Sequence, residues 1–238
     1  MRKLINITGK IALVTGGTGG IGFELCRQLA EHKCKVILTS RNSKKGVKAV
    51  KILKEMDLNV DYHQLDITCK KSVSELFKYI NSRYKRADII FNNAGIYIDS
   101  CDISEVSSKK IIDSIITNSL GALSICQVFY PLMDRNNFGR ILNISSGMGV
   151  ISTMECDSPA YRISKTVLNT ITVMYNRLNK NKNILINSVC PGPVYTNMSQ
   201  NINAKPATEA CSHLINLCRL PNGDHSGCFF RYGKLIDF

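Results

Sequence analysis

The feature that most restricts the fold is a glycine-rich turn between a short apolar run and an amphipathic segment. Residues 10–14 form the run, residues 15–22 read TGGTGGIG, and Leu25, Leu29 and Ala30 follow at helical spacing. The order strand, turn, helix is the opening of a βαβ unit. Glycines let a backbone turn tightly and approach a pyrophosphate, and a helix N-terminus attracts phosphate. The turn therefore predicts a dinucleotide site, and a tight connection without a ligand is the alternative.

Strand-like and helical segments alternate along the rest of the chain. Apolar runs typical of strands lie at 36–39, 60–65, 87–91, 140–144, 184–189 and 227–230. Helical patterns lie at 23–32, 44–56, 70–84, 107–133, 159–179 and 207–217. This alternation predicts an α/β fold with a parallel sheet covered by helices on both faces. Because the 238 residues contain no repeat or linker, we expect one domain over 1–238, a Rossmann-type doubly wound sheet.

Composition argues against several other classes of protein. Hydrophobic residues make up 44% and charged residues 21%, as in ordinary globular proteins. No uninterrupted apolar run approaches the ~20 residues that cross a bilayer. The formal net charge is +13, but the lysines are spread through the predicted helices without a basic arm or a nucleic-acid motif. We therefore expect a cytoplasmic protein that binds neither nucleic acid nor membrane.

The ten cysteines do not have the spacing of a metal or redox site. None forms a C-x-x-C pair, and several lie inside apolar runs. Buried free thiols in a reducing compartment are the simpler interpretation. The four histidines are isolated along the chain, so the sequence predicts no metal site.

One short stretch carries a candidate acid–base pair. Residues 158–165 read SPAYRISK, which places Tyr161 and Lys165 four residues apart in a predicted helix, on one face. A free tyrosine has a pKa of about 10, and a nearby cation lowers it toward values useful for proton transfer. Tyr-x-x-x-Lys also occurs in helices by chance, so the pair alone is weak evidence.

Further motifs, in order along the chain, resemble those of the short-chain dehydrogenase/reductase family. They are the T-G-x-x-x-G-x-G turn, LDIT at 65–68, NNAG at 92–95, Asn118, GRILNISS at 139–146, Tyr161 with Lys165, and PGPVYT at 191–196. The stretches SSGMG at 145–149 and GCFFR at 227–231 resemble a carbonyl-reductase-like branch. The V-D-G-G ending that supports a tetramer contact in acyl-carrier-protein reductases is absent. We therefore expect a monomer or a homodimer.

The resemblance implies hydride transfer between a nicotinamide cofactor and a carbonyl compound. Tyr161 would donate the proton, and Lys165 would lower the tyrosine pKa and bind the nicotinamide ribose. Ser146 would hold the carbonyl oxygen, and Asn118 would hold a water. Strand side chains alternate, so only one of Ser145 and Ser146 faces the site; the family pattern favours Ser146, and a one-residue shift would exchange them.

The resemblance also implies a set of cofactor contacts. Besides Asn118, Tyr161 and Lys165, they are Gly16, Thr18, Gly19, Gly20, Ile21, Gly22, Ser40, Arg41, Asp66, Ile67, Asn93, Ala94, Gly95, Pro191, Gly192, Val194 and Thr196.

The segment after the second predicted strand favours NADP(H) over NAD(H). An acidic residue there would bind the ribose 2′-hydroxyl of NAD, but residues 40–45 contain none. Arg41 can offer a forked cation to a 2′-phosphate, and Ser40 and Asn42 can add neutral hydrogen bonds. The alternative is that Arg41 points into water, as loop arginines often do. Gly19 also occupies a position where some NADP-using relatives carry a second basic residue, so this chain lacks that second cation.

The most specific function that the sequence predicts is NADPH-dependent reduction of a ketone, aldehyde or quinone to an alcohol. Reduction of a 3-oxoacyl thioester on an acyl carrier protein is the first alternative, since a basic surface suits an acidic carrier. A dinucleotide-binding regulator without catalysis is the second, and it would have no need for Asn118, Ser146, Tyr161 and Lys165 together.

Overall fold

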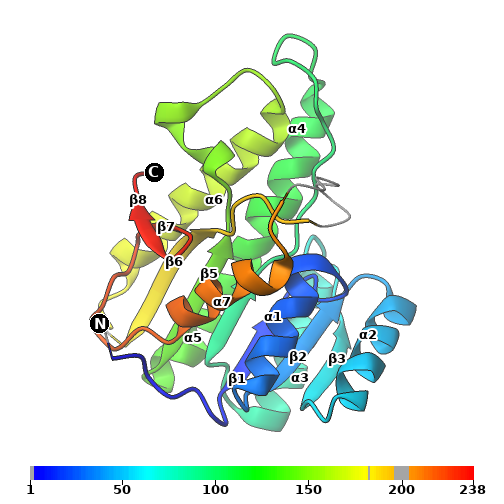
Figure 1. Ribbon diagram of the computed structural model, residues 1–238, viewed down its shortest axis with the longest axis vertical. Helices are drawn as coiled ribbons and strands as arrows, with labels where there is room; N and C mark the ends of the chain where they lie inside the picture. Colours follow the sequence, from blue (N-terminus) through cyan, green and yellow to red (C-terminus); the bar gives the residue numbers. More distant parts are fainter. Residues whose placement is uncertain (1–2, 182, 196–203) are drawn as a thin grey trace.

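The computed structural model describes residues 3–181, 183–195 and 204–238, which form one α/β sheet structure (Figure 1). The strand order of the sheet is β3-β2-β1-β4-β5-β6-β7-β8. The strands are β1 (Ile11–Val14), β2 (Lys35–Ser40), β3 (Val60–Gln64), β4 (Ile89–Asn92), β5 (Gly139–Ile144), β6 (Ile184–Cys190), β7 (Phe229–Arg231) and β8 (Lys234–Ile236). Neighbouring strands from β3 to β7 are parallel, and β8 returns antiparallel to β7. The predicted doubly wound parallel sheet is confirmed.

Helices cover both faces of this sheet. They are α1 (Gly20–Glu31), α2 (Ser43–Glu55), α3 (Lys70–Tyr84), α4 (Ser108–Ile115), α5 (Gly121–Arg135), α6 (Pro159–Leu178) and α7 (Ala207–Cys218). One core cluster joins the sheet to α1, α2 and α7, and a second joins the opposite face to α3 and α5. The central strands β1, β4, β5 and β6 are buried along their whole length. This explains why they read as continuous apolar runs.

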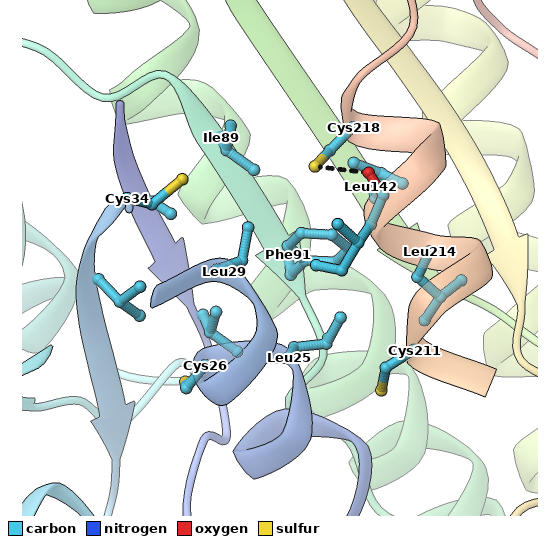
Figure 2. Close-up of a cluster of buried hydrophobic side chains, with 14 of the residues drawn as sticks. Leu25, Cys26, Leu29, Cys34, Ile89, Phe91, Leu142, Cys211, Leu214 and Cys218 are labelled. Atoms are coloured by element: carbon cyan, nitrogen blue, oxygen red, sulfur yellow. Dashed lines mark hydrogen bonds between the residues drawn. The ribbon is translucent and has the colours of Figure 1, made fainter. Parts of the chain in front are cut away.

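Most cysteines are part of this packing. Cys26 on α1, and Cys211 and Cys218 on α7, lie in a core cluster that contains several leucine side chains (Figure 2). Burial raises the pKa of the Cys34 and Cys126 thiols to about 12, so they stay protonated. All ten cysteines are free thiols. The expectation of burial is wrong for Cys69 and Cys156, which lie exposed in loops.

The helix predicted over 107–133 differs from the structure in one respect. Between α4 and α5 the backbone forms a single π-helical stretch, Ile116–Leu120, so Ser108–Arg135 is helical throughout but not α-helical throughout. By length and mean hydropathy, 1.4, this run also meets the criterion for a membrane-spanning helix. Part of the run packs against α3 and α6, as a core helix does, whereas Ile112, Ile116 and Leu120 are exposed.

The strand order places a crevice at one edge of the sheet. The chain moves outward from β1 to β2 and β3, and then returns to the other side of β1 with β4. The loops that follow β1 and β4 therefore diverge, and ligands of open α/β sheets bind at such a point.

Candidate active site at the carboxyl edge of the sheet

The glycine-rich turn leads directly into α1. The helix begins at Gly20, three residues before the predicted start, so the last glycines of the turn form its first helical residues. Gly16 has a φ of +69°, in the left-handed region that favours glycine. A Cβ atom at Gly22 would lie 2.2 Å from the carbonyl oxygen of Gly16, so no larger residue fits there. The backbone therefore folds tightly over the N-terminus of α1, as a phosphate site requires.

The loop after β4 is tied to this turn by hydrogen bonds. The Thr15 Oγ1 atom accepts the backbone N–H groups of Asn93 and Ala94, both at 2.9 Å. The Asn93 side-chain amide donates in return to the carbonyl oxygens of Thr15 (2.9 Å) and Gly16 (3.1 Å). Asn93 therefore links the two loops that flank the crevice by hydrogen bonds.

A pocket of about 220 Å³ lies between these loops and the end of β2. Its lining includes eight of the predicted cofactor residues: Gly16, Thr18, Ser40, Arg41, Asp66, Ile67, Ala94 and Gly95. It also includes Asn42, the LDIT residues Leu65 and Thr68, and Ile96 and Thr117, which the motifs do not mark as cofactor contacts. Gly19, Gly20, Ile21 and Gly22 lie in the turn beside it rather than in its wall.

The rim of this pocket has the charge expected for a phosphate-bearing ligand. The Arg41 side chain is exposed at the rim, while its carbonyl oxygen accepts a hydrogen bond from Gln64 Nε2 at 3.0 Å. Ser40 Oγ donates to the Asn42 carbonyl oxygen at 2.9 Å, which fixes the turn that presents Arg41. The hydroxyl and the backbone N–H of Thr68 hold the pKa of the Asp66 carboxyl below its usual range, and Arg41 contributes in the same direction. Asp66 is therefore ionised and available as an acceptor.

Asn118 lies at the middle of the π-helical stretch and holds the centre of the site together. Its Oδ1 accepts the Ile96 N–H at 2.7 Å, and its Nδ2 donates to the Ile96 carbonyl oxygen and to Ser164 Oγ, both at 2.9 Å. A Cβ atom at Gly95 would lie 3.1 Å from Asn118 Oδ1 and 3.8 Å from Lys165 Nζ. The segment after β4, the π turn and α6 therefore converge on one point, and π turns are frequent at functional sites.

Tyr161 and Lys165 lie together in the first two turns of α6, as predicted. Lys165 is buried, its Nζ donates to the Ile144 carbonyl oxygen at 2.7 Å, and it lies 5.4 Å from the centre of the Tyr161 ring. Burial lowers the pKa of the ammonium group from 10.5 to about 8. The ammonium therefore lies beside the phenol ring while it is held by the end of β5.

The expected lowering of the tyrosine pKa is not found. Burial raises the pKa of the Tyr161 phenol, the Cys190 thiol acts in the same direction, and the Ser146 hydroxyl opposes them. Desolvation dominates, and Lys165 donates its hydrogen bond to a backbone carbonyl rather than to the phenol oxygen. The phenol is thus kept protonated, which is the form that can donate a proton.

The two serines after β5 have different environments. Ser145 is buried, and its hydroxyl lies 3.5 Å from the Lys165 carbonyl oxygen, on the packed side. Ser146 is partly exposed, accepts the Met148 N–H at 3.2 Å, and contacts the phenol of Tyr161. The structure therefore places Ser146, and not Ser145, next to the Tyr161 phenol.

Sequence reasoning missed two residues that support α6. The Asp99 carboxylate accepts the Ala160 N–H at 2.8 Å, at the first turn of the helix. Tyr97 lies edge-on to Tyr161, with ring centres 5.1 Å apart, and its hydroxyl hydrogen-bonds Ser158 Oγ at 2.7 Å. Both come from the segment after NNAG, which carries no motif. Tyr97 and Asp99 therefore had no sequence signal that linked them to the helix containing Tyr161.

The loop after β6 closes the other side of the site. Gly192 has a φ of +75°, and a Cβ atom there would meet the Tyr232 hydroxyl at 2.1 Å, so the β7–β8 hairpin packs directly on this loop. Pro191 and Val194 are buried in it. Thr196, a predicted cofactor contact, lies outside the described residues. Within the described part of the chain no cluster of His, Cys, Asp and Glu could hold a metal ion.

A phosphate-accepting turn and a tyrosine–lysine pair at one sheet edge define a Rossmann-type oxidoreductase. The profile of the short chain dehydrogenase family matches residues 10–207. The chain therefore belongs to the short-chain dehydrogenase/reductase family.

Named relatives extend over almost the whole chain. It is 31% identical to (+)-neomenthol dehydrogenase of Capsicum annuum, over 96% of this chain and 97% of that protein. The alignment is 310 positions long, so that relative carries inserted segments that the 238 residues here lack. The structure of salutaridine reductase from Papaver somniferum is similar at a TM-score of 0.81, with 28% identity over 93% of this chain and 99% of that one. The NADPH-bound carbonyl reductase from chicken fatty liver shares the fold, at a TM-score of 0.88 and 22% identity over 97% of this chain and all of that one.

Proposed function

We propose that this protein is an NADPH-dependent reductase of small carbonyl compounds (ketones, aldehydes or quinones) in which Tyr161 donates the proton. The observation that carries the proposal is the convergence of Asn118, Ser146, Tyr161 and Lys165 beside the pocket. Relatives named as reductases or dehydrogenases support it, among them carbonyl reductase [NADPH] 3 of Rattus norvegicus, 26% identical over 89% of this chain and 91% of that protein.

The residues present fit a dinucleotide phosphate. The close packing of the turn at Gly16 and Gly22 brings a backbone without side chains to the N-terminus of α1, which suits a pyrophosphate there. Arg41 at the pocket rim suits a 2′-phosphate, and no acid stands at the end of β2 to repel it. When bound, the nicotinamide supplies the hydride.

Hydride addition to the carbonyl carbon leaves negative charge on the carbonyl oxygen, and a proton donor must neutralise that charge. Ser146, whose hydroxyl contacts the Tyr161 phenol, would hold the oxygen in place. Tyr161, kept protonated by its surroundings, would donate the proton to it. Lys165 at a pKa of about 8 is largely charged near neutral pH and stabilises the phenolate left behind. Asn118 fixes the backbone around Ile96 and α6, and so the relative positions of these groups.

The direct test is NADPH oxidation with a panel of ketones, aldehydes, quinones and acyl thioesters. We expect turnover with carbonyl compounds, and loss of turnover by 10²–10⁴-fold in Tyr161→Phe while NADPH still binds. Tyr175→Phe, on the same helix but in contact with Tyr130, is the matched control and should keep full activity. Turnover restricted to acyl thioesters would favour the carrier-protein alternative. No turnover on any substrate, with cofactor binding intact, would favour a regulator.

Cofactor choice has its own test, since it depends on Arg41. We expect kcat/KM to be higher with NADPH than with NADH, and Arg41→Asp to reduce that preference at least tenfold, because a charge-assisted hydrogen bond is lost and a carboxylate is introduced. Lys48→Asp makes the same charge change on the exposed face of α2, away from the pocket, and should not alter the preference. An unchanged ratio in Arg41→Asp would show that Arg41 does not read the 2′-phosphate.

We also propose a cytoplasmic location. Ten free thiols, with no disulfide among them, are typical of a reducing compartment. Fractionation of cells that express the tagged protein would test this.

A further inference from the structure

Arg231 ends β7 next to the turn that carries the catalytic serine. It pairs in register with Cys190 of β6, so the two side chains leave the sheet on the same face. A Cβ atom at Gly147 would lie 3.3 Å from Arg231 Nη1 and 3.7 Å from its Cζ. The guanidinium therefore lies against the residue that follows Ser146.

This guanidinium has no carboxylate partner in the described part of the chain. Its Nε is buried and makes no hydrogen bond there. Arg162, by contrast, pairs with Glu155 and Asp157, and Arg27 pairs with Glu24. A buried donor without an acceptor destabilises a fold, so an arginine left in this state indicates a group that arrives from outside.

Arg231 also lies beside an aromatic ring that a second cation shares. Its guanidinium lies 5.5 Å from the centre of the Tyr232 ring, and Lys205 lies 5.4 Å from the same ring. Lys205 is paired with Glu209, so Arg231 is the cation at this ring that no carboxylate of the described residues neutralises, and its charge favours an anionic ligand.

The position of Arg231 separates it from the cofactor's phosphates. Arg41 follows β2 and Arg231 ends β7, five strand spacings apart in the sheet, or about 24 Å. Cys190, its neighbour on β6, is close enough to influence the Tyr161 phenol electrostatically and accepts the Gly147 N–H at 3.3 Å. Arg231 thus lies at the end of the site where Gly147 and Cys190 lie, away from the pocket that Arg41 borders.

We propose that Arg231 binds a carboxylate of the substrate, and that the carbonyl compounds this enzyme prefers are oxo acids. The inference rests on the proposed reductase function and deepens it. A guanidinium can bind both oxygens of a carboxylate through parallel hydrogen bonds, which would orient the carbonyl group toward Ser146 and Tyr161.

The test compares 4-acetylbenzoate with its neutral methyl ester. We expect the wild type to prefer the acid, and Arg231→Met to lose 10- to 100-fold in kcat/KM on the acid while the ester changes less than about threefold. Arg231→Lys should retain part of the preference, because it keeps the charge but loses the fork. Lys234→Met, an exposed lysine on the other strand of the hairpin, is the control for a general loss of positive charge and should behave as the wild type.

Two results would overturn this inference while leaving the reductase intact. One is equal activity of the wild type on acid and ester. The other is an equal loss on both substrates in Arg231→Met, which would mark a structural role for the hairpin.

If no carbonyl compound is reduced, the reductase proposal fails. The carboxylate site at Arg231 can then be tested separately by measuring the binding of 4-acetylbenzoate. Calorimetric titration of 4-acetylbenzoate into the protein with NADP⁺ should then show binding that Arg231→Met weakens at least tenfold. Binding that is absent, or that the substitution leaves unchanged, would remove the carboxylate site.

Discussion

At the residue scale, Lys165 is held in the fold against an electrostatic cost. Burial lowers its pKa to about 8 in the folded protein, whereas in the unfolded chain it returns to about 10.5. Below pH 8 both states are protonated, and the cost of burying the charge is fully present, about 3 kcal/mol at 1.36 kcal/mol per pKa unit. Between pH 8 and 10.5 the unfolded chain binds more protons than the folded one. The destabilisation therefore declines as pH rises.

This sign leads to a prediction for Lys165→Met. Relative to the wild type, the free energy of unfolding of the variant should be roughly 2 kcal/mol higher at pH 7 than at pH 10, while activity is lost. Urea denaturation of both proteins at the two pH values measures the difference. Lys71→Met, on the exposed face of α3, should show no such pH dependence. A relative stability of Lys165→Met that stays constant from pH 7 to 10 would contradict the assigned burial cost.

At the element scale, the start of α6 is stabilised from outside the helix. Ser158, at its N-cap, has a φ of +51° and makes no side-chain cap, because its hydroxyl is used by Asp157 and Tyr97. Asp99 replaces that cap through the Ala160 N–H, and its negative charge also suits the positive end of the helix dipole. The first turn of α6, which contains Tyr161, therefore depends on a residue of the loop after β4.

We predict that Asp99→Ala destabilises the fold by about 0.5–2 kcal/mol and also lowers kcat, because the turn that carries Tyr161 loses its cap. Asp99→Asn keeps an acceptor oxygen and should restore part of both. Ser107 caps α4 through the Lys110 N–H, so Ser107→Ala is a matched cap deletion that should reduce stability without a change in kcat. Denaturant unfolding and steady-state kinetics on the three variants measure this. If Asp99→Ala keeps the wild-type kcat, the prediction is wrong and Asp99 contributes to stability alone.

The glycine turn offers a second comparison within one element. A Cβ atom at Gly22 meets the Gly16 carbonyl oxygen at 2.2 Å, whereas one at Gly19 meets nothing within 4 Å and the backbone there is extended. Gly22→Ala should therefore distort the turn and weaken NADPH binding at least tenfold, while Gly19→Ala should bind as the wild type. Fluorescence titration with NADPH measures both. Equal affinities in the two variants would show that the turn can relax around the added methyl group.

The burial of a strand determines whether it can be predicted from the sequence. Buried parallel strands are continuous apolar runs, which makes β1, β2, β4, β5 and β6 visible in the sequence. The strand β3 reads VDYHQ and is half-buried, so its place in the regular alternation of strands and helices is its main signal. The strand β8 is three residues long, with an exposed lysine and leucine, and it has no such signal. The π turn at Asn118 was also missed, because one widened turn hardly changes the apolar periodicity of a long helix.

Within the site, motif residues were predictable and their supports were not. Tyr161 and Lys165 are four residues apart, so helical geometry alone places them together. Tyr97 and Asp99 reach Ser158 and Ala160 across 61 positions of sequence, through a loop whose path depends on the whole sheet. The direction of the Tyr161 pKa was missed for the same reason, since desolvation is a property of the packed structure and not of the pair.

At the scale of the whole molecule, the chain's own C-terminal hairpin covers one edge of the sheet. The strand β8 pairs antiparallel with β7, so β7 is not free to pair with another molecule. The new edge is short and carries an exposed lysine, two features by which proteins limit edge-to-edge association. This observation argues against a tetramer built through this edge of the sheet.

We therefore predict a monomer or a homodimer, with a mass of one or two 26.5 kDa chains by light scattering at micromolar concentration. A stable tetramer would contradict this. The hairpin turn allows a sharper test, because Tyr232 and Gly233 both have positive φ angles, and a β-branched residue at Gly233 (φ +74°) is strained. Gly233→Val should release β8 and give larger assemblies whose mass rises with concentration. Gly9→Val places the same residue at the same φ in a loop before β1, so it controls for strain alone and should leave the mass unchanged.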